Sequence, residues 1–152
     1  MAISIRPLSP TIGGEVDGAD LTKPLTPENV AAIEAGMDKH ADLVFHNQNF
    51  TDEQQKAFTR NFGELEVPSN VSNIQKAEAR RIDGTMADVS NLDQDHKPLA
   101  KDDRIRMFGL GNRLWHSDSS FRAVPAKYSL LSGRIVPAQG GNTEFADMRA
   151  AY

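Results

Sequence analysis

With 152 residues, 39% of them hydrophobic and 25% charged, the chain has the size and composition of one globular domain with its own core. It has no cysteine, which excludes disulfides and thiolate metal sites, and no signal peptide or membrane span of roughly 18 apolar residues, so we expect a cytoplasmic protein without membrane partners. The net charge is −4, divided into −7 on residues 1–100 and +3 on residues 101–152, a basic end that suits a small anionic ligand but is too scattered for nucleic acid.

Two short strands are predicted in the first third of the chain. Residues 3–8 alternate apolar and polar side chains, which is typical of a strand, and Gly13 and Gly14 predict a turn after it. Residues 42–48 are mostly apolar at their start and predict a short buried strand.

Two helices are predicted on either side of the second strand. Residues 27–40 follow Thr26, a suitable N-cap, and residues 52–62 follow a capping box made by Thr51 and Gln54. Apolar side chains recur at helical spacing in both, and they predict the faces that pack on the sheet: Val30, Ile33, Met37, Phe58 and Phe62.

The second half of the chain has a weaker pattern. Residues 66–103 predict a long loop with one strand near 88–92, and loops of this length are often functional. Residues 113–121 and 127–136 predict two strands, and residues 142–152 predict a short strand followed by the first turn of a helix.

The segment LWHSDSSF, residues 114–121, carries the clearest chemical pattern. On a strand, residues two apart point to the same face, so His116 and Asp118 can converge on one metal ion. One imidazole and one carboxylate are two of the three ligands in the facial triad of non-haem Fe(II) oxygenases. Spacing alone leaves a second interpretation open, in which the imidazole only hydrogen-bonds a nearby carboxylate.

Two motifs extend this pattern: Trp-His-x-Asp, and a Gly-Gly-x-Thr that places Thr143 twenty-seven residues after His116. Through these, and through LVFHNQNFTDEQQKAFTRNFGELE and VSNLDQDHKPLAKD, the chain resembles the taurine dioxygenase family of Fe(II)/2-oxoglutarate-dependent oxygenases. Within the family it is most similar to the alpha-type 2,4-dichlorophenoxyacetate dioxygenases. The resemblance implies an α/β fold, a double-stranded β-helix (jelly roll) with flanking helices, of which residues 1–152 form the N-terminal part of a single dioxygenase domain.

Position by position, the resemblance implies a role for five residues. His116 and Asp118 match the first two Fe(II) ligands, and Thr143 matches the hydroxyl donor to the distal carboxylate of the cosubstrate 2-oxoglutarate. Asn112 matches a position that faces substrate, and Lys97 matches a lysine near the active site of the phenoxyacetate enzymes. Plainer interpretations stay open for the last three: a strand threonine, a polar loop residue and a solvated loop lysine.

The family's third iron ligand, a later histidine, and its arginine for 2-oxoglutarate have no counterpart here. His40 and His46 precede the motif and do not replace that histidine. The sequence also stops within a predicted helix. We therefore expect an N-terminal part of a longer protein, which by itself would hold iron poorly and would not turn over.

The activity implied by the resemblance is hydroxylation of an aryloxyalkanoate such as 2,4-dichlorophenoxyacetate, giving a phenol and glyoxylate with succinate and CO2. The partners would be a small anionic aromatic substrate and O2, and a homo-oligomer is compatible with this function. Two alternatives stay open: the same mechanism on taurine or another small sulfonate or carboxylate, and a non-catalytic jelly-roll binding module. Intact His-x-Asp and Gly-Gly-x-Thr motifs favour the enzyme.

Overall fold

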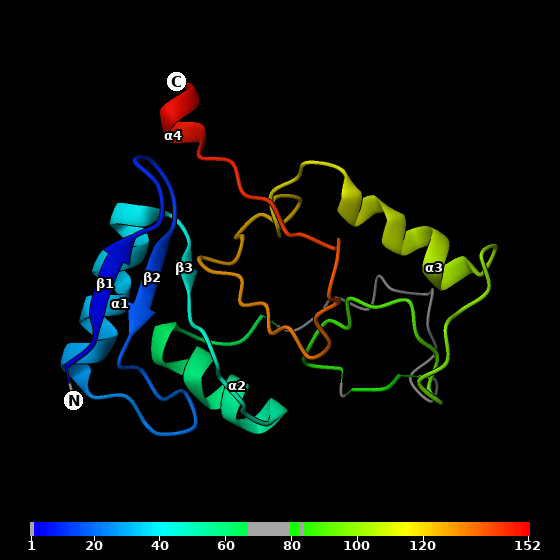
Figure 1. Cartoon of the computed structure of the whole chain (residues 1–152), viewed down its shortest axis with the longest axis horizontal. Coiled ribbons are helices and arrows are strands. Elements are labelled where there is room, and N and C mark those ends of the chain that lie inside the picture. The colour runs from blue at the N-terminus through cyan, green and yellow to red at the C-terminus, as the bar shows by residue number, and fades with distance from the viewer. Residues whose placement is uncertain (1, 67–79, 83) are drawn as a thin grey trace. The chain divides into compact units, whose positions relative to one another are not determined.

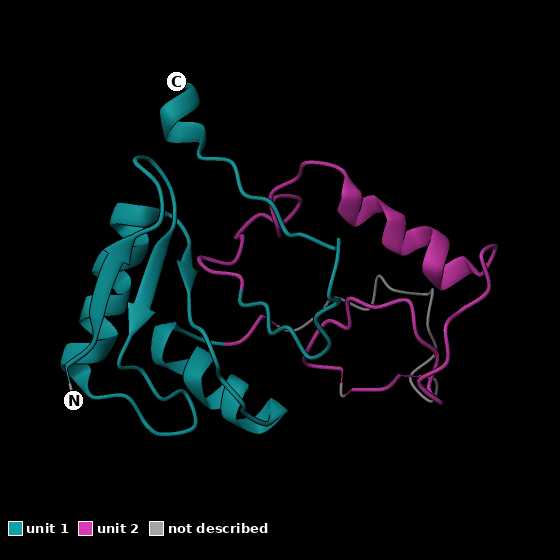
Figure 2. Cartoon of the chain, viewed as in Figure 1, with its two compact units in different colours: residues 1–64, 130–152 teal, residues 65–129 magenta. Residues whose placement is uncertain are grey.

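The chain forms two compact units in the computed structural model (Figure 2). The structure describes all residues except 1, 67–79 and 83. Unit 1 comprises Met1–Glu64 and Leu130–Tyr152, and unit 2 comprises Leu65–Ser129. In the part of the chain that is described, no helix is long and apolar enough to cross a membrane.

Unit 1 contains a three-stranded sheet of β1 (Ser4–Pro7), β2 (Gly14–Asp17) and β3 (Leu43–Val44), in that order (Figure 1). β1 and β2 pair antiparallel, and β2 and β3 pair parallel. The strand predicted at the N-terminus is confirmed. β2 was missed, because its first residue lies in the predicted glycine turn. The strand predicted over 42–48 is shorter in the structure. Only the two residues of β3 form it, since β3 pairs with only two residues of β2.

Both helices predicted in unit 1 are confirmed, with their caps. Thr26 Oγ1 accepts a hydrogen bond from the Asn29 amide at 3.3 Å. The capping box is complete: Thr51 Oγ1 accepts from the Gln54 amide at 3.2 Å, and Gln54 Oε1 accepts from the Thr51 amide at 2.8 Å. The elements that result are α1 (Pro27–His40), α2 (Asp52–Thr59) and a 3-10 turn, η1 (Arg60–Phe62).

The helix α1 packs so closely on the sheet that two glycines are required. A Cβ atom on Gly36 would lie 2.5 Å from Ile5 Cδ1, and one on Gly14 would lie 2.8 Å from Leu43 Cδ2. Separations below 3 Å between such atoms are repulsive, so the Ile5 and Leu43 side chains would have to shift to admit a larger residue at these positions.

The core of unit 1 is built from both predicted helical faces. Ile33 and Phe58 are buried together with Leu21. The Phe58 ring meets the edges of Phe45 and Phe62, with ring centroids 5.8 and 5.2 Å apart. None of the five side chains predicted to face inward is exposed, because Val30, Met37 and Phe62 are half-buried. This confirms the periodicity argument.

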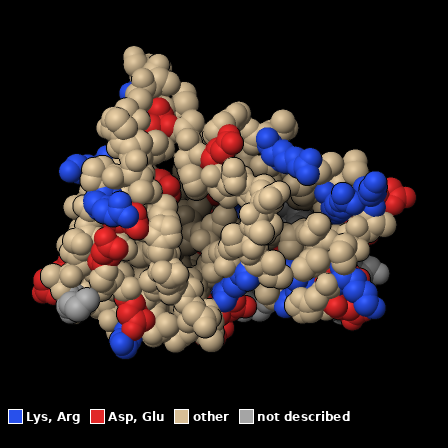
Figure 3. Space-filling model, viewed as in Figure 1, with Lys and Arg blue, Asp and Glu red and all other residues tan. Residues whose placement is uncertain are grey.

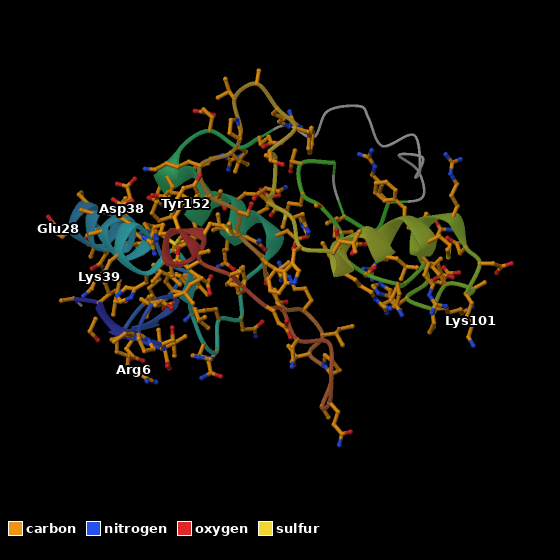
Figure 4. The ribbon with its side chains drawn as sticks, turned by 90° about the horizontal axis from the view of Figure 1, so that it is seen from above. Arg6, Glu28, Asp38, Lys39, Lys101 and Tyr152 are labelled. Carbon is orange, nitrogen blue, oxygen red and sulfur yellow. The ribbon has the colours of Figure 1, made fainter. Side chains whose placement is uncertain are left out.

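A short helix, α4 (Met148–Ala151), ends the chain and confirms the predicted helical turn. Arg149 joins it to the last turn of α1, since its guanidinium donates to the Asp38 carbonyl at 2.7 Å and to the Lys39 carbonyl at 3.4 Å. Figure 4 labels Asp38 and Lys39 on α1, with Tyr152 at the end of α4. Carbonyls in a last helical turn lack helical partners and attract cations, so Arg149 caps α1.

Unit 2 contains one helix that the sequence analysis missed. α3 (Arg104–Gly109) begins at Asp103, whose carboxylate accepts from the Ile105 amide at 2.8 Å and the Arg106 amide at 3.4 Å. It continues into a 3-10 turn, η3 (Leu110–Arg113). The aspartate before this run was the available signal, because aspartate is among the best N-cap residues.

The prediction of strands over residues 113–121, 127–136 and 142–147 is wrong, because these segments form no regular strand. The helix α4 follows as expected. A strand needs a neighbour that accepts and donates its backbone hydrogen bonds, and alternation in one segment cannot supply it. The described residues thus form helices and one small sheet, without the two packed sheets of the predicted jelly roll.

The long loop predicted over 66–103 falls partly on 67–79 and 83, which lie outside the described residues. Where it is described, the strand predicted near 88–92 is reduced to a single antiparallel bridge between Leu92 and Pro98.

Candidate metal and cosubstrate site

The segment that carries the His-x-Asp pair begins where η3 ends, at Leu114. The Leu114 amide donates to the Gly111 carbonyl at 3.0 Å, which closes the 3-10 turn, and Leu114 itself is extended with φ −90° and ψ 143°. His116 and Asp118 do not lie on a strand, contrary to the prediction that they stand at a strand end.

The two side chains converge. His116 Nε2 lies 3.2 Å from Asp118 Oδ1, with 49% and 59% of the side chains exposed. Two ligands at about 2.1 Å from one metal and at a right angle to each other lie about 3 Å apart. The spacing expected of a shared metal is thus present, and both side chains stay open to a ligand from solvent.

A backbone hydrogen bond places a hydrogen on one nitrogen of the His116 imidazole. His116 Nδ1 lies 2.7 Å from the Leu114 carbonyl oxygen, which can only accept, so Nδ1 carries a hydrogen. Nε2 then faces a carboxylate oxygen in one of two ways: as an imidazolium N–H, or as a lone pair that needs a cation between the two acceptors. An N–H to a carbonyl on one side and a metal on the other is the usual arrangement of histidine ligands. The residues present fit a divalent metal.

The pair provides two protein ligands. Among the described residues, no group of three or more histidine, cysteine, aspartate or glutamate side chains gathers to hold a metal ion. This matches the sequence, which lacks the later histidine of the implied triad.

Asn112 and Lys97, the two residues expected to face substrate, are both exposed. Asn112 lies in η3, four residues before His116. Within the described residues no hydrogen bond or ion pair joins either side chain to the His116–Asp118 pair. Their substrate contacts stay predictions.

The loop that carries Lys97 is held by its neighbours. Asp93 Oδ1 accepts from the Lys97 amide at 2.9 Å, and the Asp93 amide donates to the Lys97 carbonyl at 2.8 Å. Arg81 donates two hydrogen bonds to the Asp88 carboxylate, of 2.8 and 2.7 Å. Hydrogen bonding to Asp88 raises the pKa of Arg81, so the guanidinium remains charged. Lys97 therefore projects from an ordered turn.

Thr143 is exposed and follows two glycines with positive φ, Gly140 at 70° and Gly141 at 71°. It belongs to unit 1, whereas His116 and Asp118 belong to unit 2. That Thr143 faces the same cavity as the metal pair therefore stays a prediction.

Sequence reasoning missed a carboxylate at this site. Glu66 accepts a hydrogen bond from Ser119 Oγ at 2.7 Å and pairs with Arg122 Nε at 2.5 Å. It stands 53 positions before Ser119. A contact over that separation leaves no periodic or motif signal in a single sequence.

Charged side chains of both signs lie on the surface of the molecule (Figure 3). On the face shown in Figure 3, Lys and Arg side chains are interspersed with Asp and Glu and do not gather into one stripe. The absence of a nucleic-acid partner stays a prediction.

Comparison with known proteins places these residues in context. Residues 4–152 match a family described as taurine catabolism dioxygenase TauD, TfdA family. The chain is 42% identical to alpha-ketoglutarate-dependent 2,4-dichlorophenoxyacetate dioxygenase of Burkholderia sp. (strain RASC), over 100% of this chain and 50% of that protein. It is 35% identical to (S)-phenoxypropionate/alpha-ketoglutarate-dioxygenase of Delftia acidovorans, over 99% of this chain and 48% of that one.

A solved structure is similar over the whole chain. The crystal structure of AAD-2 in complex with Mn(II) and N-oxalylglycine matches with a TM-score of 0.85 and 55% identity, covering 100% of this chain and 49% of that one. The chain thus spans about half the length of the curated relatives it matches. The likeness includes the segments with His116, Asp118 and Thr143.

Proposed function

Because this chain belongs to the TauD, TfdA family of taurine catabolism dioxygenases, we propose that its protein uses Fe(II) and 2-oxoglutarate to hydroxylate an aryloxyalkanoate. The structural observation behind the proposal is the 3.2 Å approach of His116 Nε2 to Asp118 Oδ1. The substrate class is supported by relatives named for 2,4-dichlorophenoxyacetate and phenoxypropionate.

The roles of the residues follow from their donor and acceptor chemistry. His116 and Asp118 would hold Fe(II), which supplies O2 activation coupled to decarboxylation of 2-oxoglutarate. The hydrogen bond from Nδ1 to the Leu114 carbonyl would keep the imidazole oriented so that Nε2 could bind the metal. Thr143 would donate its hydroxyl to the far carboxylate of 2-oxoglutarate, a short charge-assisted bond.

The substrate contacts and products are part of the same proposal. Lys97 would pair with the substrate carboxylate, and Asn112 would hydrogen-bond the substrate close to the metal pair. Hydroxylation of the carbon beside the ether oxygen gives a hemiacetal, which breaks to a phenol and glyoxylate, while the cosubstrate leaves as succinate and CO2. For 2,4-dichlorophenoxyacetate, the phenol would be 2,4-dichlorophenol.

The architecture proposed for the intact protein is a jelly roll, with residues 1–152 as the N-terminal part of one dioxygenase domain. The support is the TM-score of 0.85 to a chain about twice as long. The third iron ligand and the arginine for 2-oxoglutarate would come from the remaining chain. Homo-oligomerisation and a cytoplasmic location stay predictions, and light scattering of the intact protein measures the first.

A second candidate keeps the mechanism and changes the substrate to taurine or another small sulfonate. The family description, which names taurine catabolism, is the observation in its favour. Hydroxylation beside the sulfonate would release sulfite instead of a phenol, so the two candidates differ in a product that is easily measured.

The deciding experiment measures succinate release by the full-length gene product with Fe(II) and 2-oxoglutarate. Phenoxyacetates, both enantiomers of phenoxypropionates, and taurine are compared as substrates, with assays for phenol, glyoxylate and sulfite. We expect phenol and succinate in equal amounts with a phenoxyacetate. His116→Ala should abolish this turnover without changing the helical circular dichroism, because its side chain is half-exposed.

Three other results would each contradict part of the proposal. Sulfite release with little phenol would move the substrate to the sulfonate class. Succinate release by His116→Ala at the wild-type rate would remove His116 from the metal site. No succinate with any substrate, in a protein that still binds Fe(II) and 2-oxoglutarate, would favour the non-catalytic module.

A further inference from the structure

The chain reverses direction immediately after Asp118. The Arg122 amide donates to the Ser119 carbonyl at 3.0 Å, and Ser120 Oγ donates to the Ser117 carbonyl at 3.1 Å. Ser119 has a φ of 55°, in the left-handed region that residues with a Cβ atom rarely adopt. Such a conformation persists when surrounding contacts hold it in place.

Glu66 provides these contacts at both ends of the turn. One carboxylate oxygen accepts from Ser119 Oγ at 2.7 Å, and the other lies 2.5 Å from Arg122 Nε. The side chains of Glu66 and Arg122 are 31% and 25% exposed, so water screens the pair only in part. A single carboxylate thus fastens the first and last residues of the turn.

The fastened turn adjoins the metal pair. Ser119 follows Asp118 directly, so its backbone conformation determines how the chain leaves the aspartate. We propose that Glu66 is a positioning residue, which holds Ser119 left-handed and thereby keeps the Asp118 carboxylate directed at His116 Nε2, 3.2 Å away. This inference rests on the proposed function, in which His116 and Asp118 hold the metal. It adds a residue that touches neither metal nor substrate.

The test measures Mn(II) affinity of the full-length gene product by electron paramagnetic resonance, without turnover. Glu66→Ala should weaken Mn(II) binding by about ten-fold, the lower end of what losing a residue that orients a metal ligand usually costs. Glu64→Ala is the matched control, because Glu64 is an exposed carboxylate two residues earlier. Its Mn(II) affinity should equal that of the wild type.

A glycine rescue separates positioning from general stability. Glycine adopts positive φ without a Cβ penalty, so the turn should need Glu66 less when residue 119 is glycine. Glu66→Ala combined with Ser119→Gly should therefore recover most of the lost Mn(II) affinity. A merely structural Glu66 would not show this recovery, because Ser119→Gly restores none of its contacts.

Two references keep each result decisive. His116→Ala should lose Mn(II) binding; if it binds like the wild type, the metal assignment itself is wrong. If His116→Ala loses Mn(II) but Glu66→Ala matches Glu64→Ala, only the positioning role is overturned. Should Glu66→Ala fail to fold, Glu66→Leu replaces it, since leucine fills a similar volume but can neither accept from Ser119 nor pair with Arg122. Glu66→Leu should bind Mn(II) more weakly than Glu64→Ala, and equal affinity would overturn the role.

Discussion

Residues 2–62 bury most of their large apolar side chains, whereas residues 104–152 leave many of theirs exposed. In the first region Ile33, Phe58 and their neighbours close a core, and among its described large hydrophobic residues only Leu8 is exposed. In the second region thirteen are exposed: Met107, Phe108, Leu110, Leu114, Trp115, Phe121, Val124, Leu131, Ile135, Val136, Phe145, Met148 and Tyr152.

The difference shows where each region finds its partners. The elements of the first region contact one another within about 60 residues of sequence, and both of its helices could be predicted from local patterning. The second region has the motif residues and an apolar surface of the kind that interaction with more chain buries. The proposed completion of the jelly roll by further chain would cover this surface, and the chain spans about half the length of the relatives it matches.

A matched pair of Phe→Ala substitutions tests this comparison most directly. In the chain of residues 1–152, Phe58→Ala should lower the free energy of unfolding by about 3–5 kcal/mol, because Phe58 is 7% exposed and packs on two other rings. Phe121→Ala should change it by less than about 0.5 kcal/mol, because Phe121 is 79% exposed. Urea unfolding followed by far-ultraviolet circular dichroism measures both.

The same pair in the full-length gene product gives the complementary result. Phe58→Ala should cost a similar amount there, whereas Phe121→Ala should become clearly destabilising once further chain covers it. An equally small effect of Phe121→Ala in both proteins would show that this surface stays open, and the proposed completion of the jelly roll would lose its main physical support.

The predictability of the fold follows the same division. The 3.6-residue stripe and the caps at Thr26 and Thr51 predicted α1 and α2, because a helix makes its hydrogen bonds within its own segment. The strand-like run at residues 113–121 predicted a strand that is not formed, because a strand depends on a partner elsewhere. β2 was missed for a related reason: its pairing, not its own composition, makes it a strand.

Of the candidate site, the sequence predicted what lies within one short segment. His116 and Asp118 stand two positions apart and converge within one short segment, so the motif alone could point to both. Glu66 could not be predicted, since only the fold brings it to Ser119. Whether Thr143 lies near the metal pair also depends on how the chain folds, so it needs an experiment.

Thr143→Val in the full-length gene product tests whether Thr143, an exposed motif residue of the second region, binds 2-oxoglutarate. Loss of one hydrogen bond to a charged group costs roughly 1.5–3 kcal/mol, so 2-oxoglutarate should bind one to two orders of magnitude more weakly. Fe(II) affinity and unfolding should stay nearly unchanged. Isothermal titration with 2-oxoglutarate under anaerobic conditions measures the effect, and an unchanged affinity would restore the plain interpretation of a surface threonine.

Removing an N-cap from each region gives a smaller contrast. Thr51→Ala breaks the capping box of α2, which carries Phe58 into the core, and should lower the free energy of unfolding by about 1 kcal/mol. Asp103→Ala removes the cap of α3, none of whose residues is buried, so it should fray that helix without moving the main transition. Hydrogen exchange at the first amides of both helices resolves the two effects. Equal shifts of the main transition would mean that α3 is part of the same core.

The smallest expected effect is electrostatic and concerns Asp20, in a loop of the first region. Lys23 Nζ lies 2.7 Å from its carboxylate, and Thr22 donates its hydroxyl at 2.5 Å and its amide at 3.1 Å. The hydrogen bond from Lys23, followed by those from Thr22, lowers the pKa of Asp20 from 3.8 to about 2. Since the folded pKa lies below the unfolded one, this contribution to stability is present above about pH 4 and is lost as the pH falls toward 2.

All of these contacts to Asp20 come from within three residues, so they should not depend on any further chain. Carboxyl NMR titration should therefore give the same depressed pKa in the chain of residues 1–152 and in the full-length gene product. Asp20→Asn should remove a small part of the loss of stability between pH 4 and 2. Asp17→Asn is the matched reference, because Asp17 is an exposed carboxylate that Arg6 approaches only to 3.8 Å. A pKa for Asp20 that is depressed only in the full-length protein would contradict the view that the first region is organised by its own sequence neighbours.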